Sequence, residues 1–104
     1  MASKREYLDF ILEQLSDMED IIFRRMMGEY ILYYRGRIFG GIYDDRLLVK
    51  QVSAAVKLMP DAEIEKPYDG AKEMILVNDV DDRGFLKNLV ESMWEELPEK
   101  KRKV

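Results

Sequence analysis

The chain has 104 residues, of which 47% are hydrophobic and 37% are charged, a composition typical of one folded globular domain. Its 17 basic and 21 acidic residues give a net charge of −4, which disfavours general electrostatic attraction to nucleic acid or to anionic membranes. Cysteine and histidine are both absent, which excludes disulfides, thiolate nucleophiles, zinc sites made of these residues and histidine acid–base catalysis.

Signals for membranes and export are also missing from the sequence. No run of about 18 apolar residues exists, so no segment is expected to span a bilayer. The first ten residues, MASKREYLDF, lack the apolar core of a secretion signal. We therefore expect a cytoplasmic protein that has no membrane partner.

The first predicted element is a helix over residues 3–15. Ser3 followed by Glu6 fits a capping box, in which each side chain accepts a hydrogen bond from the backbone of the other residue. The spacing of the apolar residues then predicts one buried stripe on this helix, made of Leu8, Ile11, Leu12 and Leu15.

Residues 22–50 are predicted to form three or four short strands in an antiparallel meander. The segment carries most of the β-branched and aromatic residues, and Arg35-Gly36 and Asp44-Asp45 fall where hairpin turns are needed. Gly36 adopts a positive φ at no steric cost, which favours a tight turn there. Gly40 and Gly41 lie in mid-strand, where adjacent glycines indicate a bulge, a bend or the close approach of another backbone. We favour this structural interpretation over contact with a ligand.

The second half of the chain is predicted to add a strand and two helices. Ser53 is expected to cap a short helix that Pro60 ends, and residues 61–66 read as acidic and irregular. Asp69-Gly70 is a strong turn pair ahead of a strand at residues 73–77. The last helix is expected over residues 83–97, capped by Asp81 or Asp82.

This order of elements predicts an α+β fold, with an antiparallel meander sheet and N- and C-terminal helices packed against it. Residues 1–98 are expected to form a single domain. Residues 99–104, EKKRKV, are expected to be a basic flexible tail.

The most distinctive group of polar residues in the meander is a set of four arginines. Residues 21–37 hold Arg24, Arg25, Arg35 and Arg37 against one acid, Glu29, a local balance of +3. A hairpin about Gly36 is expected to bring the first and last of them towards one side of the sheet. Guanidinium groups suit phosphate or carboxylate partners. The favoured alternative is that they pair with the acidic helices, since residues 1–20 carry six acids against two bases.

The meander resembles the N-terminal domain of the TfoX/Sxy family, bacterial regulators of natural competence. The resemblance is carried by residues 25–30, RMMGEY, then by Tyr33, Gly36 and the pair Asp44-Asp45. It continues through residues 67–72, PYDGAK, and the closing helix with its lysine-rich end. Met27 stands where the family usually has phenylalanine.

The resemblance implies a single-domain, non-catalytic regulatory or protein-interaction module without a cofactor. Two-domain members of the family act with a cyclic-AMP receptor protein, which implies a protein partner such as a transcription factor. The candidate interaction surface is Arg24, Arg25, Glu29, Tyr33, Arg35 and Arg37. The glycines and turn residues assigned a structural role are Gly28, Gly36, Gly40, Gly41, Asp69 and Gly70.

Two other functions and two oligomeric states stay open at this point. Direct nucleic-acid binding would use the same arginines, interleaved with tyrosines that stack on bases. A small enzyme working with carboxylates is the less favoured option, because no spacing in the sequence supplies a set of converging groups. The sequence is compatible with a monomer or a homodimer.

Overall fold

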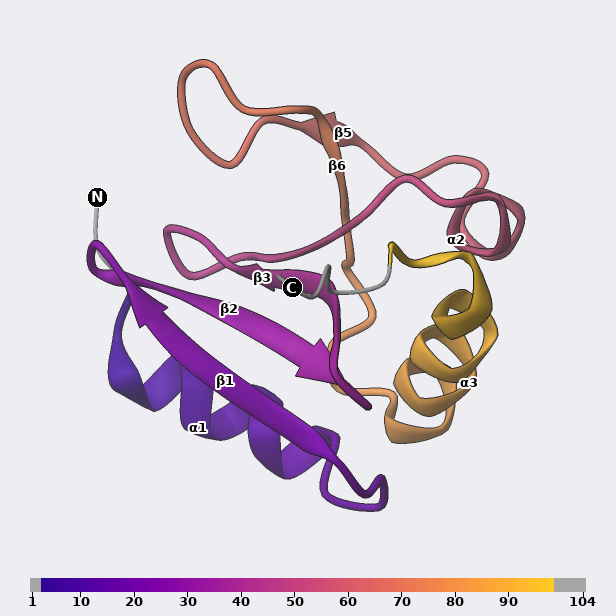
Figure 1. Cartoon of the computed structure of the whole chain (residues 1–104), viewed down its shortest axis with the longest axis horizontal. Helices are drawn as coiled ribbons and strands as arrows, with labels where there is room; N and C mark the ends of the chain where they lie inside the picture. Colours follow the sequence, from indigo (N-terminus) through magenta and orange to yellow (C-terminus); the bar gives the residue numbers. More distant parts are fainter. Residues whose placement is uncertain (1–2, 99–104) are drawn as a thin grey trace, which may run out of the picture.

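The computed structural model describes residues 3–98, and Figure 1 shows how their helices and strands are arranged. The expected basic tail at residues 99–104 lies outside the described residues. The elements are α1 (Arg5–Gln14), β1 (Ile21–Met26), β2 (Glu29–Tyr34), β3 (Arg37–Ile42), β4 (Leu47–Val49), α2 (Ser53–Leu58), β5 (Ile64–Glu65), β6 (Met74–Leu76), α3 (Arg83–Met93) and the 3₁₀ turn η1 (Trp94–Glu96).

The strands form one six-stranded sheet in the order β1-β2-β3-β4-β6-β5, and every neighbouring pair is antiparallel. The first four strands are a meander, so the predicted α+β fold with helices at both ends of the chain is confirmed. None of the helices within residues 3–98 has the length and apolar character needed to cross a bilayer.

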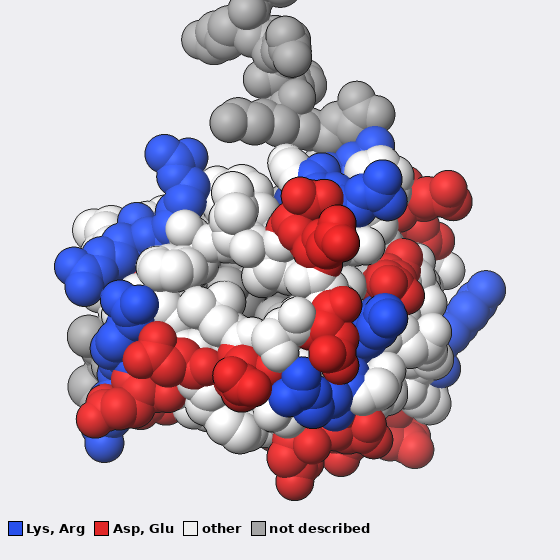
Figure 2. Space-filling model, turned by 90° about the horizontal axis from the view of Figure 1, so that it is seen from below, with Lys and Arg blue, Asp and Glu red and all other residues white. Residues whose placement is uncertain are grey.

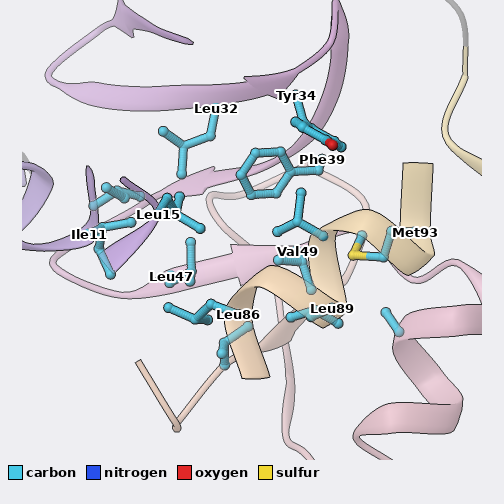
Figure 3. Packing of buried hydrophobic residues seen from close by; sticks show 14 of the residues in the cluster. Ile11, Leu15, Leu32, Tyr34, Phe39, Leu47, Val49, Leu86, Leu89 and Met93 are labelled. Carbon is cyan, nitrogen blue, oxygen red and sulfur yellow. The ribbon is translucent and has the colours of Figure 1, made fainter. Parts of the chain in front are cut away.

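The core lies between one face of this sheet and the two longer helices. α1 contributes the buried side chains of Leu8 and Ile11, followed by Leu15 just beyond its end, and α3 contributes Leu86, Leu89, Val90 and Met93. Figure 3 shows Leu47 and Val49 of β4 between the side chains of β2 and β3 and those of α3. Full burial of such a side chain stabilises the fold by about 1.5–3 kcal/mol.

The paired glycines of β3 allow neighbouring backbones to come unusually close. A Cβ atom added to Gly40 would lie 2.2 Å from the carbonyl oxygen of Leu48, and one added to Gly41 would lie 2.5 Å from that of Tyr30. The register of β2 and β3 also shifts at this point, which leaves Phe39 without a partner on β2. The structural interpretation of Gly40 and Gly41 is confirmed, because both a bulge and a close approach are present.

The hairpin turns use residues in the left-handed region. Arg35 and Gly36 have φ angles of 49° and 83°, and Asp44 and Asp45 have φ angles of 53° and 57°, so both predicted turns of the meander are confirmed. Met27 and Gly28, with φ angles of 53° and 85°, form a further turn between β1 and β2 that the sequence analysis did not identify. Further along the chain, the predicted turn at Asp69-Gly70 is present, and Gly70 has a φ of 87°.

Helix capping is where the predictions were least accurate. The capping box is wrong: α1 begins after Lys4 without a side-chain cap, and the Ser3 hydroxyl bonds to other parts of the chain. Ser53 is the first residue of α2 rather than its cap, and the Glu96 carboxylate accepts from the backbone N–H of Ala54 at 2.7 Å. Asp82 does cap α3, by accepting from the N–H of Phe85 at 3.0 Å.

Two element boundaries also differ from those expected. Residues 61–66 are not wholly irregular, because Ile64–Glu65 pairs with β6 as the short strand β5. The last helix ends its α-helical part at Met93 and continues as the 3₁₀ turn Trp94–Glu96.

A substitution at Gly40 tests the close approach of β3 and β4. We expect Gly40→Ala to lower the free energy of unfolding by roughly 1–3 kcal/mol, because the new methyl group meets backbone that cannot move aside locally. The matched control is Gly84→Ala in α3, where the nearest atom lies 3.7 Å from an added Cβ. There we expect no loss, or a gain of up to about 1 kcal/mol. Chemical denaturation measures both, and equal stability of the two variants would contradict the assignment.

Candidate functional site

The candidate arginines divide into two pairs at opposite ends of the β1–β2 hairpin. Arg24 lies opposite Ile31, and Arg25 lies opposite Tyr30, near the turn that joins β1 and β2. Arg35 lies in the turn at the other end of β2, and Arg37 follows that turn. Both are three to five residues further along the hairpin, or roughly 10–17 Å at the rise of a strand. The expected gathering of the first and last arginines is therefore not observed.

Arg35 and Arg37 are engaged by Trp94 at the end of the last helix. The guanidinium carbon of Arg37 lies 3.8 Å from the centre of the indole ring, and that of Arg35 lies 5.0 Å from it. Arg37 also donates to the carbonyl oxygen of Trp94 at 2.9 Å, and the indole N–H donates to the carbonyl oxygen of Tyr34 at 3.1 Å. These contacts hold the C-terminal helix against the β2–β3 turn, so both arginines have a structural role.

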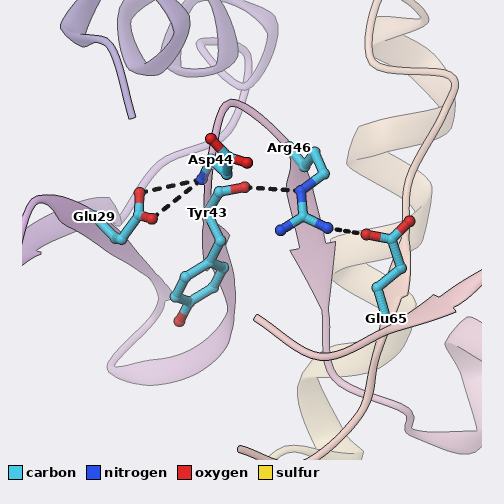
Figure 4. Close-up of polar contacts among 5 residues, drawn as sticks. All are labelled: Glu29, Tyr43, Asp44, Arg46 and Glu65. Atoms are coloured by element: carbon cyan, nitrogen blue, oxygen red, sulfur yellow. Dashed lines mark hydrogen bonds and ion pairs between the residues drawn. The ribbon is translucent and has the colours of Figure 1, made fainter. Parts of the chain in front are cut away.

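Glu29 has a structural role as well. Its carboxylate accepts from the Ser3 hydroxyl and, at 3.2 Å to each oxygen, from the backbone N–H of Asp44, as Figure 4 shows for the second contact. The Ser3 oxygen in turn accepts from the N–H of Asp45 at 3.0 Å. Glu29 therefore fixes the start of the chain to β2 and to the β3–β4 turn.

Figure 4 also shows a second anchor beside this turn. Arg46 donates to the carbonyl oxygen of Tyr43 at 3.1 Å and forms an ion pair with Glu65 of β5. The β3–β4 turn is thus held by carboxylates from two different strands.

Arg24 and Arg25 differ from the other candidates because their side chains are exposed and make no hydrogen bond, ion pair or ring contact with another residue between 3 and 98. The acids of the first helix pair with other arginines: Asp9 with Arg5 at 2.9 Å, and Glu13 with Arg83 at 3.5 Å. Among residues 3–98, Arg24, Arg25 and Arg35 form no ion pair with an acid of the helices, so the alternative of pairing with the acidic helices is not realised for these three.

The strand that carries these two arginines is an edge of the sheet. Within residues 3–98, β1 has six residues and pairs only with β2, whereas the strand at the other edge, β5, has two residues. An open cleft of about 470 Å³ runs between the end of α1 and β1. It is lined by Leu12, Leu15, Ser16, Met18, Ile21, Ile22 and Phe23.

Sequence reasoning did not identify Ile22 and the cleft beside it. Ile22 lies in a strand of otherwise half-buried apolar residues, yet its side chain is 55% exposed. The order of strands decides which of them is an edge, and no local pattern in the sequence reports that order. The adjacent pair Arg24-Arg25 was the one available signal, since charged residues are common on edge strands.

Tyr33, the remaining candidate, is half-buried on the face of the sheet opposite the core. The register places it opposite Ile22, two residues from the level of Arg24 on that face.

Acidic and basic side chains are interspersed on the side of the molecule seen in Figure 2, around a white, partly hollowed centre. No single sign of charge dominates that side.

Four titratable groups have shifted pKa values: the hydrogen bond to Asp9 raises the pKa of Arg5, and burial is the main cause for the other three. Burial raises the pKa of the Tyr43 phenol, with smaller contributions from Tyr68 and Glu29, and it raises the pKa of Tyr7, to which Asp45 also contributes. Burial lowers the pKa of Lys50, and the nearby Lys72 adds to this effect.

Between residues 3 and 98, no three carboxylates converge as a metal ion would require.

Comparisons with known proteins agree with the resemblance seen in the sequence. The family model of the TfoX N-terminal domain matches residues 13–95. A protein of Spirochaeta aurantia, described as an uncharacterized 12.7 kDa protein in the trpE 5′ region, is 34% identical over 80 residues. That match covers 77% of this chain and 70% of the relative. No solved structure matches the chain at a significant level.

Removal of the Glu29 carboxylate tests its structural role. We expect Glu29→Ala to lower the free energy of unfolding by about 1–3 kcal/mol, because the Asp44 N–H and the Ser3 hydroxyl lose their acceptor. Glu19→Ala is the matched control, since Glu19 is exposed and has no such partner among the described residues. Urea denaturation of both variants measures the difference, and a Glu29→Ala variant as stable as the control would refute this role.

The raised pKa of Tyr43 predicts a loss of stability at alkaline pH. As pH rises through the ordinary tyrosine value of 10.0, the unfolded chain gives up its proton first, so the free energy of unfolding falls until the folded pKa is reached. Tyr43→Phe removes this contribution. Denaturation at about pH 8 and about pH 10.5 should show a smaller alkaline loss for the variant than for the wild type. Tyr7→Phe should change the loss in the same direction, and equal losses in all three proteins would contradict the assignment.

Proposed function

We propose that this chain, which belongs to the TfoX N-terminal domain family, is a non-catalytic regulatory module that binds a protein partner through the edge strand β1. The observation that carries the proposal is the pair Arg24 and Arg25, exposed on an open edge without a partner among the described residues. A transcription factor is the proposed class of partner, and competence is the proposed process, because these follow from the family resemblance.

The structural contacts made by the other candidate residues support this choice of surface. Arg35, Arg37 and Glu29 hold parts of the fold together, and their substitution would disturb the structure itself. The side chains of Arg24 and Arg25 make no such structural contact within the described chain, and arginine is enriched at protein interfaces. Exposed Ile22 lies beside them on the same strand and adds apolar surface.

Direct nucleic-acid binding is the second candidate. It is favoured by one observation, the placement of Arg24 and half-buried Tyr33 on the same face of the β1–β2 hairpin. Against it stand the net charge of −4 and the mixed charges seen in Figure 2, because such binding depends on a field of positive potential. We therefore place it below a protein partner.

Charge reversal tests the proposed surface. We expect Arg24→Glu/Arg25→Glu to reduce recovery of the wild-type partner from cell extract at least tenfold, since both exposed cations become anions. The matched control is Lys57→Glu/Lys66→Glu, which changes the net charge equally at two exposed positions elsewhere. Partners are identified by mass spectrometry, and binding is then measured with the purified protein. A partner bound equally by both double variants would overturn the proposal.

The same proteins separate the two candidate functions. If the surface bound nucleic acid, the wild type would shift labelled DNA or RNA at low salt and lose affinity steeply as salt rises. We expect no shift at low salt.

A further inference from the structure

We infer that the proposed partner contributes an extended acidic segment, which pairs along β1 as an additional strand and places apolar side chains in the α1–β1 cleft. This inference rests on the proposed function and names the chemistry of the partner. It is carried by three features of the described chain that meet at one place: a strand edge with no neighbour among residues 3–98, an apolar cleft beneath it, and two arginines whose side chains have no partner in that range.

The backbone of β1 provides the first feature. In an antiparallel pair, alternate residues direct their N–H and C=O groups towards the neighbouring strand and the others direct theirs away from it. Because β1 has one strand neighbour in the described sheet, about half of its backbone groups face outward. Six residues are long enough for a ladder of several hydrogen bonds, the mode by which peptides are added to sheet edges.

The alternation of side chains on β1 specifies what an added strand must carry. Ile21 and Phe23 lie opposite buried Tyr34 and Leu32, so they point towards the helix-covered face and the cleft. Residues of the added strand that lie beside Ile21 and Phe23 would also point towards the cleft, over side chains of α1. Apolar residues fit these positions best, because the cleft is apolar.

Charge specifies the alternate positions. Arg24 points to the opposite face, and a residue of the added strand beside it is best an acid, because cross-strand pairs of opposite charge are stabilising. Arg25, one position further, is directed by the same alternation to the face of Ile21 and Phe23 but lies outside the lining of the cleft, so it adds a second cation at that end of the edge. The fitting segment therefore alternates apolar and acidic residues.

The same charges disfavour a second copy of this chain as the occupant. If two β1 strands paired in antiparallel over all six residues, the centre of the pairing would fall between Phe23 and Arg24. Arg24 of one copy would then lie opposite Phe23 of the other and Arg25 opposite Ile22, so four arginines would gather at the pairing without an acid opposite any of them, which disfavours it.

A purely protective role of the arginines makes a different prediction. Charged residues on edge strands commonly prevent pairing with other chains, which is a sufficient reason for Arg24 and Arg25 to be present. In that case, their removal would promote self-association and would leave binding of an acidic peptide unchanged. Peptide binding and the oligomeric state therefore have to be measured on the same variants.

The test uses a fluorescein-labelled peptide of about seven residues that alternates Val and Glu, with a Val/Lys peptide of equal length as the control. Fluorescence anisotropy measures binding to the whole chain, and amide hydrogen exchange reports protection along β1. We expect the Val/Glu peptide to bind and to slow exchange of the β1 amides. Arg24→Ser/Arg25→Ser should weaken its binding at least tenfold, Ile22→Ser should weaken it less, and the Val/Lys peptide should not bind.

Several results would overturn the inference. These are no binding of the Val/Glu peptide, equal binding by the wild type and the double serine variant, and a wild-type dimer in sedimentation whose β1 amides are already protected. If the cellular partner still depends on Arg24 and Arg25 while the peptide does not bind, strand addition fails and the proposed function stands. If the partner is indifferent to both arginines, the proposed function fails as well.

Discussion

The burial of two apolar helix stripes against one face of a single sheet is the constraint on which the rest of this structure depends. α1 and α3 are far apart in sequence, yet their leucines belong to the same core as Leu32, Phe39 and Val49. Within the sheet, β3 and β4 approach closely at Gly40, where a larger residue would meet the carbonyl of Leu48. α1 covers the start of the meander in Figure 1, but it leaves the outer edge of β1 without a strand neighbour.

Polar contacts complete the fold at two points far from the centre of the core. The carboxylate of Glu29 joins the start of the chain to the β3–β4 turn, and the ring of Trp94 joins the last helix to the β2–β3 turn. Both contacts use residues that looked available for binding when only their charge was considered. Arg24 and Arg25 are distinguished by the absence of such a connection within residues 3–98.

Most of the fold could be predicted from the sequence because its signals are local. Alternating apolar residues, the turns at Gly36 and Gly70 and the stripe of the last helix depend on neighbours within a few positions. The capping box failed for the opposite reason: Ser3 bonds to Glu29 and to Asp45, 26 and 42 positions away. The short strand β5 was missed because its two residues carry too little pattern and depend on β6 for their pairing.

The candidate site was predicted only in part, because its remaining features depend on contacts between residues that are far apart in the sequence. The two arginines whose side chains have no partner within residues 3–98 were named from composition, but the separation of the four into two pairs follows from strand register. The cleft beside β1 follows from the packing of α1 across the sheet edge, which no single segment encodes.

The indole held between α3 and the β2–β3 turn has a practical consequence. Trp94 is the sole tryptophan of the chain, and two guanidinium groups lie over its ring. Its intrinsic fluorescence is therefore a site-specific probe of the docking of the C-terminal helix. The Trp94 ring lies at the opposite end of the β1–β2 hairpin from Arg24 and Arg25. Emission from the native protein thus follows helix undocking in one region of the molecule, independently of probes placed along the exposed strand.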